Sequence, residues 1–183
     1  MINFNFPHQS AKTSGSVLQR LRQSSLQGDG ASTKAVESKL EKLFGLPTLL
    51  TSSCTASLEM AVILSEVSSG DEVIVPSYTF SSTANAVALR GATPVFVDVN
   101  PYDLNIDVDK ARSALTAKTK AIIIVHYGGV PAHPDKFRSL CDEFGLVLIE
   151  DAAQAIGVSY KGKPLGSWGD FGCISFHATK NIQ

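Results

Sequence analysis

The sequence has 183 residues, and 16 Lys and Arg against 17 Asp and Glu leave a formal net charge of -1. That balance argues against a general nucleic-acid binder, because such proteins usually present a basic face. Apolar residues make up 44% of the chain, which is enough for a sizeable core in about one domain and too many for a disordered chain.

Helical patterns dominate the first third of the chain. Residues 34–44 place their apolar side chains on one face and stop at Gly45. Residues 48–51 are a candidate short strand. The run 52–67 that follows has a strong helix pattern, which predicts a helix that starts next to that strand.

Five short apolar runs rich in β-branched residues then predict buried strands. They lie at 72–75, 94–99, 121–125, 146–149 and 173–176, at intervals of about 25 residues. Between them, 79–90, 107–115 and 134–144 have helix patterns, whereas 157–172 holds five glycines and is predicted to be a hairpin or an ordered loop. This alternation predicts an α/β fold with a mostly parallel sheet flanked by helices.

The cysteines and the apolar runs exclude several classes. Cys54, Cys141 and Cys173 are odd in number and far apart, which suggests neither a disulfide framework nor a zinc knuckle and favours a cytoplasmic location. No paired-histidine motif is present, so no metal site is predicted. The N-terminus lacks the pattern of a signal peptide, and no run approaches the ~20 apolar residues of a membrane span.

The serine- and threonine-rich segment 52–57 precedes a helix. The first turn of a helix offers unpaired N–H groups and the positive end of the dipole, which suit a phosphate. Ordinary capping of the helix by Ser or Thr explains the same residues. The segment lacks the lysine and the glycines of a P-loop.

Further candidates follow four of the predicted strands. Glu150 and Asp151 end the fourth strand, where ligands bind in open α/β sheets, although Asp151 could equally cap a following helix. Lys180 lies just beyond the fifth strand, either exposed or near a pocket that makes its amine nucleophilic. Phe80 follows the first strand and could stack on a flat ligand, although a core position is the default. His126, at the end of the third strand, is placed where pocket residues occur.

Taken together, these segments resemble one family. TSSCTASLEMA, GDEVIVPSYTF, RGATPVFVDV, IVHYGGV, IEDAAQAIG and YKGKPLGSWGDFGCISFHATKN occur in the order and spacing of the DegT/StrS sugar aminotransferases, which depend on pyridoxal 5'-phosphate (PLP). The resemblance runs from about residue 3 to residue 181. It implies the large domain of a fold-type-I aminotransferase with a mixed seven-stranded sheet.

The resemblance assigns a role to individual residues. Lys180 matches the lysine that holds PLP covalently, and Asp151 matches the acid that pairs with the pyridine nitrogen. Gln154 matches the residue near the phenolic oxygen of PLP, and Phe80 the aromatic residue that stacks on its ring. The remaining matches are the phosphate-binding residues Thr55, Ala56 and Ser175.

The resemblance also implies an activity. Its nearest members make dTDP-4-amino-4,6-dideoxygalactose for enterobacterial common antigen, so the expected reaction passes an amino group from glutamate to a dTDP-4-keto-6-deoxy-sugar in cell-surface polysaccharide or lipopolysaccharide synthesis. Family members act as homodimers. Lys180 favours the aminotransferases over the dehydratase branch, which has His there.

Length is the one departure from the family pattern. Family members are roughly twice as long, so residues 1–183 are expected to be the N-terminal part of the PLP-binding large domain, without the C-terminal small domain. We therefore expect the 183-residue chain to be inactive by itself. A non-catalytic fragment is the alternative. An unrelated doubly wound nucleotide-binding module is disfavoured because no GxGxxG follows a strand.

Overall fold

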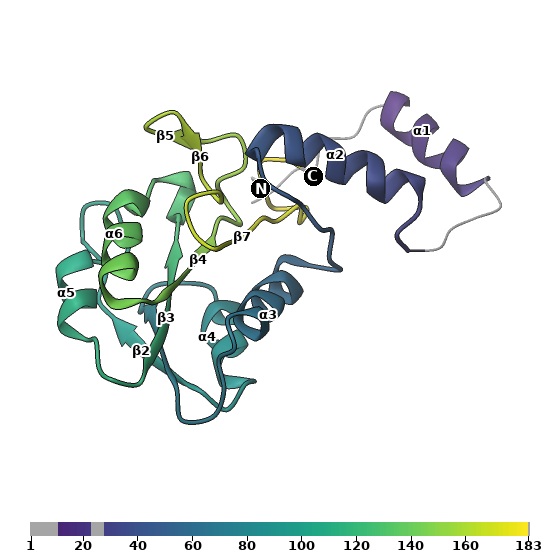
Figure 1. Ribbon diagram of the computed structural model, residues 1–183. Helices are drawn as coiled ribbons and strands as arrows, with labels where there is room; N and C mark the ends of the chain where they lie inside the picture. Colours follow the sequence, from purple (N-terminus) through teal and green to yellow (C-terminus); the bar gives the residue numbers. More distant parts are fainter. Residues whose placement is uncertain (1–10, 23–27, 183) are drawn as a thin grey trace, which may run out of the picture. The chain divides into compact units, whose positions relative to one another are not determined.

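A computed structural model of the protein describes residues 11–22 and 28–182. The chain forms two compact units (Figure 1). The larger unit comprises residues 51–176, and the smaller one combines residues up to 50 with those from 177 onward.

The smaller unit contains two helices. They are α1 (Ala11–Leu21) and α2 (Ala31–Phe44). The predicted helix at 34–44 is confirmed and begins three residues earlier. It ends as expected at Gly45, which adopts a left-handed conformation (φ 69°) and donates its N–H to the Glu41 carbonyl over 2.7 Å.

The candidate strand at 48–51 is not formed among the described residues. The Leu50 N–H instead donates to the Glu37 carboxylate over 2.9 Å, and the Thr51 hydroxyl donates to the Ser53 carbonyl. A strand needs a neighbouring ladder for its backbone groups, and here side chains satisfy part of that requirement.

The larger unit is an α/β sandwich built on a five-stranded sheet in the order β2-β1-β3-β4-β7, with every neighbouring pair parallel. Its strands are β1 (Glu72–Pro76), β2 (Thr93–Val97), β3 (Thr119–Val125), β4 (Val147–Asp151) and β7 (Phe171–Cys173). The helices are α3 (Cys54–Leu64), α4 (Ser81–Ala88), α5 (Val108–Ser113) and α6 (Pro134–Phe144), with a short 3-10 turn, η1 (Tyr127–Gly129). The predicted fold class is confirmed.

Two apolar layers cover the sheet. On one face, α3 and α4 pack over Val73, Val75, Ile123 and Ile149; on the other, α5 and α6 pack over Ile74, Ile122, Ile124 and Leu148 (Figure 1). Residues of a strand point alternately to the two faces, and both faces are buried here, which explains why the strands are continuous apolar runs.

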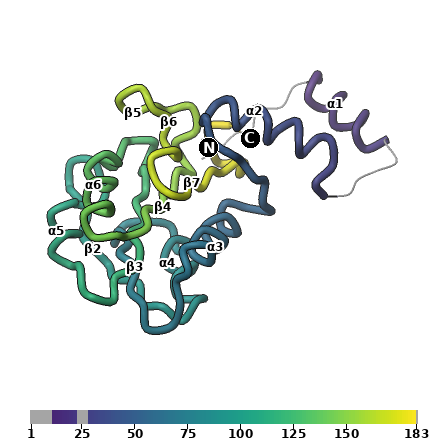
Figure 2. The backbone as a smooth tube through the Cα atoms, viewed as in Figure 1, coloured from purple at the N-terminus to yellow at the C-terminus, as the bar shows by residue number. Residues whose placement is uncertain are grey.

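The last stretch differs from the expectation in detail. A two-stranded antiparallel hairpin, β5 (Ser159–Tyr160) and β6 (Lys163–Pro164), confirms the predicted hairpin and leads into β7 (Figure 2). β7 ends at Cys173 rather than starting there, because the ladder closes when the Ala152 N–H donates to the Cys173 carbonyl and the chain after β4 turns away. The described sheet has five parallel strands instead of the mixed seven implied by the resemblance.

No helix in the described ranges is long and apolar enough to cross a membrane.

Candidate functional site

The carboxyl ends of the parallel strands share one edge of the sheet. The central strands β3 and β4 run side by side to this edge, where Val125 is opposite Asp151. Helix α3 precedes β1 and packs against β7, so it runs antiparallel to the strands and begins at the same edge. In open α/β sheets, this edge is where ligands bind.

Asp151 is a buried carboxylate at that edge, with 4% of its surface exposed. The Thr83 hydroxyl of α4 donates to its Oδ2 over 2.9 Å, and the Ala153 N–H donates to Oδ1 over 3.2 Å. No helix follows β4 directly, so the prediction that Asp151 caps a helix is wrong. Donors around a buried acid favour its ionised form, which is the form that binds a cationic ring nitrogen.

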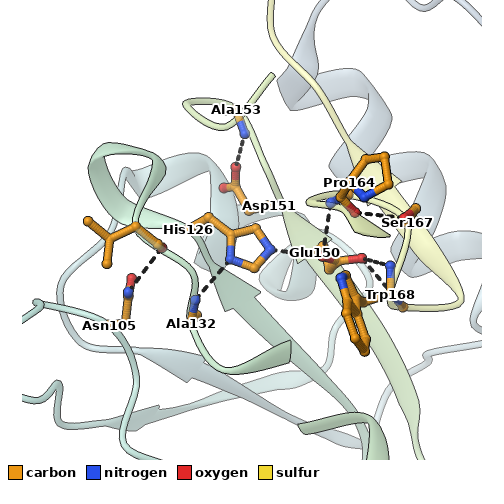
Figure 3. A network of polar contacts seen from close by, with 12 residues as sticks. Asn105, His126, Ala132, Glu150, Asp151, Ala153, Pro164, Ser167 and Trp168 are labelled. Carbon is orange, nitrogen blue, oxygen red and sulfur yellow. Dashed lines mark hydrogen bonds and ion pairs between the residues drawn. The ribbon is translucent and has the colours of Figure 1, made fainter. Parts of the chain in front are cut away.

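Glu150 precedes Asp151 and points to the opposite face of the sheet, because side chains alternate along a strand. It is fully buried. Its Oε1 accepts the N–H groups of Trp168 (2.5 Å) and Gly169 (2.7 Å), and its Oε2 accepts the Gly166 N–H over 2.9 Å (Figure 3). Glu150 therefore ties β4 to the loop that precedes β7.

His126 completes the Glu150 network rather than lining a pocket. Its Nε2 lies 2.8 Å from Glu150 Oε2, and its Nδ1 accepts the Ala132 N–H over 3.1 Å (Figure 3). Because Nδ1 accepts, the ring hydrogen is on Nε2 and is donated to the carboxylate. The expected pocket position of His126 is thus corrected: the side chain is buried and structural.

Gln154 is held against η1. Its Oε1 accepts the Gly128 N–H over 2.7 Å, so its amide NH₂ is the end that can donate to a ligand oxygen. Buried Asn105 holds η1 in place: its side-chain oxygen accepts the Tyr127 N–H, and its side-chain amide donates to the Val130 carbonyl. Gly129 has φ 80°, and a Cβ there would press on the Gln154 carbonyl, so this position requires glycine.

Helix α3 begins with a capping serine, as one of the two interpretations of segment 52–57 predicts. Ser53 caps the helix and accepts the Ala56 N–H over 3.1 Å, and Thr55 and Ala56 form the first turn at the edge of the sheet. Ser175 is buried two residues beyond β7, the strand on which α3 packs. Capping by Ser53 already uses the Ala56 N–H, so a phosphate would have to compete with Ser53 for that donor, and the phosphate-binding role of Thr55, Ala56 and Ser175 stays a prediction.

Phe80 is not a core residue. Its side chain is 73% exposed and immediately precedes α4, three residues before Thr83, which contacts Asp151. Phe80 is therefore on the surface and not in the core, where a phenylalanine is expected by default. Its ring is available to stack on a ligand ring.

Lys180 belongs to the smaller unit. It is half-buried in a turn in which its N–H donates to the His177 carbonyl over 2.8 Å, while the His177 ring lies 2.9 Å from the Thr179 hydroxyl. The His177 side chain is exposed. The role of Lys180 stays a prediction.

Sequence reasoning missed several residues at the edge of the sheet. Thr83 sits in a helix of small residues that gave no sign of a buried donor, and Asn105 lies outside the motifs that the sequence pattern marked. The Glu150–His126 pair had a signal: both residues lie at the carboxyl ends of buried strands that are neighbours in the sheet. His126 lies two positions beyond Ile124, the residue opposite Glu150, so its side chain is on the same face of the sheet as Glu150.

The residues fit PLP by the chemistry of their groups. A buried carboxylate at the strand ends suits a protonated pyridine, the exposed Phe80 suits a flat ring, and the first turn of α3 suits a phosphate. Within the described residues, no group of three or more His, Cys, Asp or Glu side chains could hold a metal ion.

Comparisons with known proteins agree with this geometry. Residues 8–183 match the DegT/DnrJ/EryC1/StrS aminotransferase family. The uncharacterized protein MJ1066 of Methanocaldococcus jannaschii is 45% identical over 130 residues, which are 71% of this chain and 34% of that protein.

Two solved structures are similar over nearly the whole chain. Spr1654 of Streptococcus pneumoniae, assigned as a sugar aminotransferase and solved in its PLP form, is 34% identical with a TM-score of 0.91 over 100% of this chain and 50% of its own. DesI, solved in the presence of its TDP-sugar product, is 35% identical with a TM-score of 0.88 over 98% of this chain and 46% of its own. The chain thus spans about half the length of these structures, and it belongs to the DegT/DnrJ/EryC1/StrS aminotransferase family.

Proposed function

We propose that the chain is the cofactor-binding part of a PLP-dependent sugar aminotransferase, and that both of its units belong to the large domain. The observation that carries this proposal is Asp151, a buried acid held by Thr83 and Ala153 at the edge of the sheet where α3 begins. Membership of the family and the PLP form of Spr1654 support it.

The residues of this chain divide the work of binding. The α3 N-terminus at Thr55 and Ala56, with Ser175, would hold the phosphate of PLP, and Phe80 would stack on its ring. Asp151 would keep a proton on the ring nitrogen, and the Gln154 amide would donate to the phenolic oxygen.

Lys180 carries the proton transfers in this proposal. Its amine would hold PLP covalently at rest and, once released by an amino donor, would move the proton from the donor's Cα. When bound, PLP supplies a protonated ring that takes up the electron pair of that carbon. Fixing the ring through its phosphate keeps it aligned with the Lys180 amine.

The substrates follow from the family and from the TDP-sugar product of DesI. We propose glutamate as amino donor and a dTDP-4-keto-6-deoxy-sugar as acceptor, with dTDP-4-amino-4,6-dideoxygalactose as the product. The pathway proposed is cell-surface polysaccharide synthesis, such as lipopolysaccharide or enterobacterial common antigen, by a homodimer in the cytoplasm.

The deciding experiment is borohydride reduction of the chain in the presence of PLP, followed by peptide mass spectrometry. We expect one phosphopyridoxyl group, on Lys180, and its loss in Lys180→Ala. Lys163→Ala, which changes an exposed lysine above the Trp168 ring, is the matched control and should label normally. Undiminished labelling of another lysine in Lys180→Ala would refute the role of Lys180.

A further inference from the structure

Two tyrosines from different strand ends form an exposed pair beside Gln154. Tyr78 follows β1 and Tyr127 begins η1 after β3, and β1 and β3 are neighbours in the sheet. Their ring centroids are 4.7 Å apart at a tilt of 43°, and their hydroxyl oxygens are 2.7 Å apart. Tyr78 is 46% exposed, so the pair presents aromatic surface instead of filling the core.

The pair is held rigidly from the Tyr127 side. Buried Asn105 accepts the Tyr127 N–H over 3.0 Å, and Gln154 accepts the N–H of the next residue, Gly128. The hydrogen bond to Tyr78, followed by burial, raises the pKa of Tyr127 above its usual range, so this phenol is protonated at neutral pH. A ligand would therefore meet a preorganised surface.

Counting hydrogens shows what the pair offers. Each phenol has one O–H, and a single hydrogen bond between the two oxygens uses only one of them. Within the described part of the chain, the two hydroxyls have only each other as partners. One O–H is thus left to donate outward, next to two partly exposed aromatic rings.

The position of the pair relates it to the reacting part of a substrate. Tyr127 lies two residues beyond Val125, the position opposite Asp151, and directly precedes Gly128, whose N–H Gln154 accepts. In the proposed function Gln154 would contact the phenolic oxygen of PLP, which is next to the ring carbon that bears the reacting group. In a nucleotide-linked sugar, the diphosphate separates the base from the sugar ring, so groups beside Gln154 would meet the sugar and not the base.

We propose that Tyr78 and Tyr127 form the sugar-binding wall of this site: their rings pack on the apolar face of the hexose, and the unshared O–H donates to a sugar hydroxyl or keto oxygen. This inference rests on the proposed function and deepens it. Aromatic surface with one convergent polar group is typical of small-molecule sites.

Single and double variants separate recognition from structure. In Tyr78→Phe or Tyr127→Phe the remaining phenol keeps its O–H and can still donate, so each single variant should lose less than about 2-fold in affinity. The double variant removes both hydrogens and should lose about 3- to 10-fold, the usual effect of one hydrogen bond. If the tyrosines served only to hold each other, each single variant would already show the whole effect.

The measurement is calorimetric titration of the 183-residue chain with dTDP-glucose, which has a hydroxyl where the substrate has a ketone, and with dTDP, which lacks the sugar. We expect the double variant to weaken dTDP-glucose only. Tyr102→Phe, which changes a 95% exposed tyrosine, is the control, and thermal denaturation reports any loss of folding.

The other outcomes overturn either the inference or the function. Equal weakening of both ligands would assign the pair to the base or to structure and would refute the inference, as would an unchanged affinity in the double variant. If the unmodified chain bound neither ligand, the proposed substrate class would fail and the inference with it.

Discussion

Glu150 and Asp151 are adjacent in the sequence, similar in chemistry and equally buried, yet their surroundings differ on the two faces of β4. Glu150 accepts three backbone N–H groups and the His126 ring, all supplied by the scaffold. Asp151 accepts the Thr83 hydroxyl and one nearby N–H, and it faces the helix layer that begins at the ligand edge. One carboxylate organises the fold, and the other is the one that we propose binds the cofactor.

The difference teaches that burial of an acid does not by itself identify a functional residue. The two differ in their partners: three backbone N–H groups of one loop and a histidine ring hold Glu150, whereas a hydroxyl of helix α4 and the Ala153 N–H contact Asp151. The predictions below test this division by the change in the free energy of unfolding, from the largest to the smallest.

Glu150→Ala is expected to have the largest effect. It leaves the N–H groups of Gly166, Trp168 and Gly169 buried without an acceptor, so we expect a loss of about 3–5 kcal/mol in the free energy of unfolding, measured by urea denaturation. Glu143→Ala, which breaks an exposed bidentate pair with Arg112, is the control and should leave the free energy of unfolding nearly unchanged. Equal losses in the two variants would contradict the structural role of Glu150.

Gly172→Ala tests the loop that Glu150 holds. A Cβ at this position would overlap the carbonyl of Gly166, which is backbone and cannot rotate away. We expect β7 to shift and the free energy of unfolding to fall by about 1–3 kcal/mol. Gly15→Ala, where a Cβ meets nothing within 4 Å, should not destabilise the chain, because alanine favours a helix interior. A Gly172→Ala variant as stable as the unmodified chain would contradict this packing.

Asp151→Asn should separate stability from function. The amide oxygen can still accept one of the two hydrogen bonds, so the free energy of unfolding should change by less than about 1 kcal/mol. Amine transfer by the complete enzyme should fall by orders of magnitude, because the ring nitrogen would lose the charge that keeps it protonated. Near-normal turnover would refute the assigned role, and a loss of stability as large as that of Glu150→Ala would remove the contrast.

Asp170→Asn should give the smallest change in the free energy of unfolding, present near neutral pH and lost in acid. Burial raises its pKa, but the Leu148 N–H and the Arg138 guanidinium lower it by more, so it lies below the ordinary 3.8. The stabilisation is complete above the unfolded pKa and is lost as pH falls through the lower folded value. Because the side chain is 44% exposed, it should amount to less than about 1 kcal/mol.

The measurement compares urea denaturation of Asp170→Asn and of the unmodified chain between pH 7 and pH 2. The two stabilities should converge in acid. Asp142→Asn removes the other carboxylate that pairs with Arg138 and controls for the loss of a partner charge. A difference that stays constant down to pH 2 would show that Asp170 contributes through its shape alone.

The fold could largely be predicted because a buried parallel sheet has a simple sequence pattern. Each central strand is a continuous apolar run, and α6 starts at a proline and ends at a glycine, as expected from 134–144. The strand at 173–176 was misplaced because Gly172, which pairs with Glu150 of β4, interrupts the apolar pattern after Phe171. Segment 48–51 looked like a strand, but it forms no ladder and contacts side chains instead.

The site could be predicted only where one residue type carries the chemistry. Asp151 was singled out because an acid at the end of a buried strand is unusual, and only the family resemblance gave it a role that stays a prediction, whereas Thr83, Asn105 and Tyr127 were missed because their contacts are with partners distant in sequence. The exposure of Phe80 also escaped prediction, since the sequence cannot tell a phenylalanine at a ligand edge from one in the core.

Because side chains alternate along β4, the number of residues in this strand determines which face each acid occupies. Deleting one residue from 147–149 by an in-frame loss of three nucleotides would keep both acids but exchange their faces. Aspartate would then meet the loop at 166–169, which is built to the longer reach of glutamate, and glutamate would enter the apolar layer at the position of Ile149. Point substitutions can change either acid alone, whereas insertions and deletions in this strand would remove scaffold and chemistry in a single event.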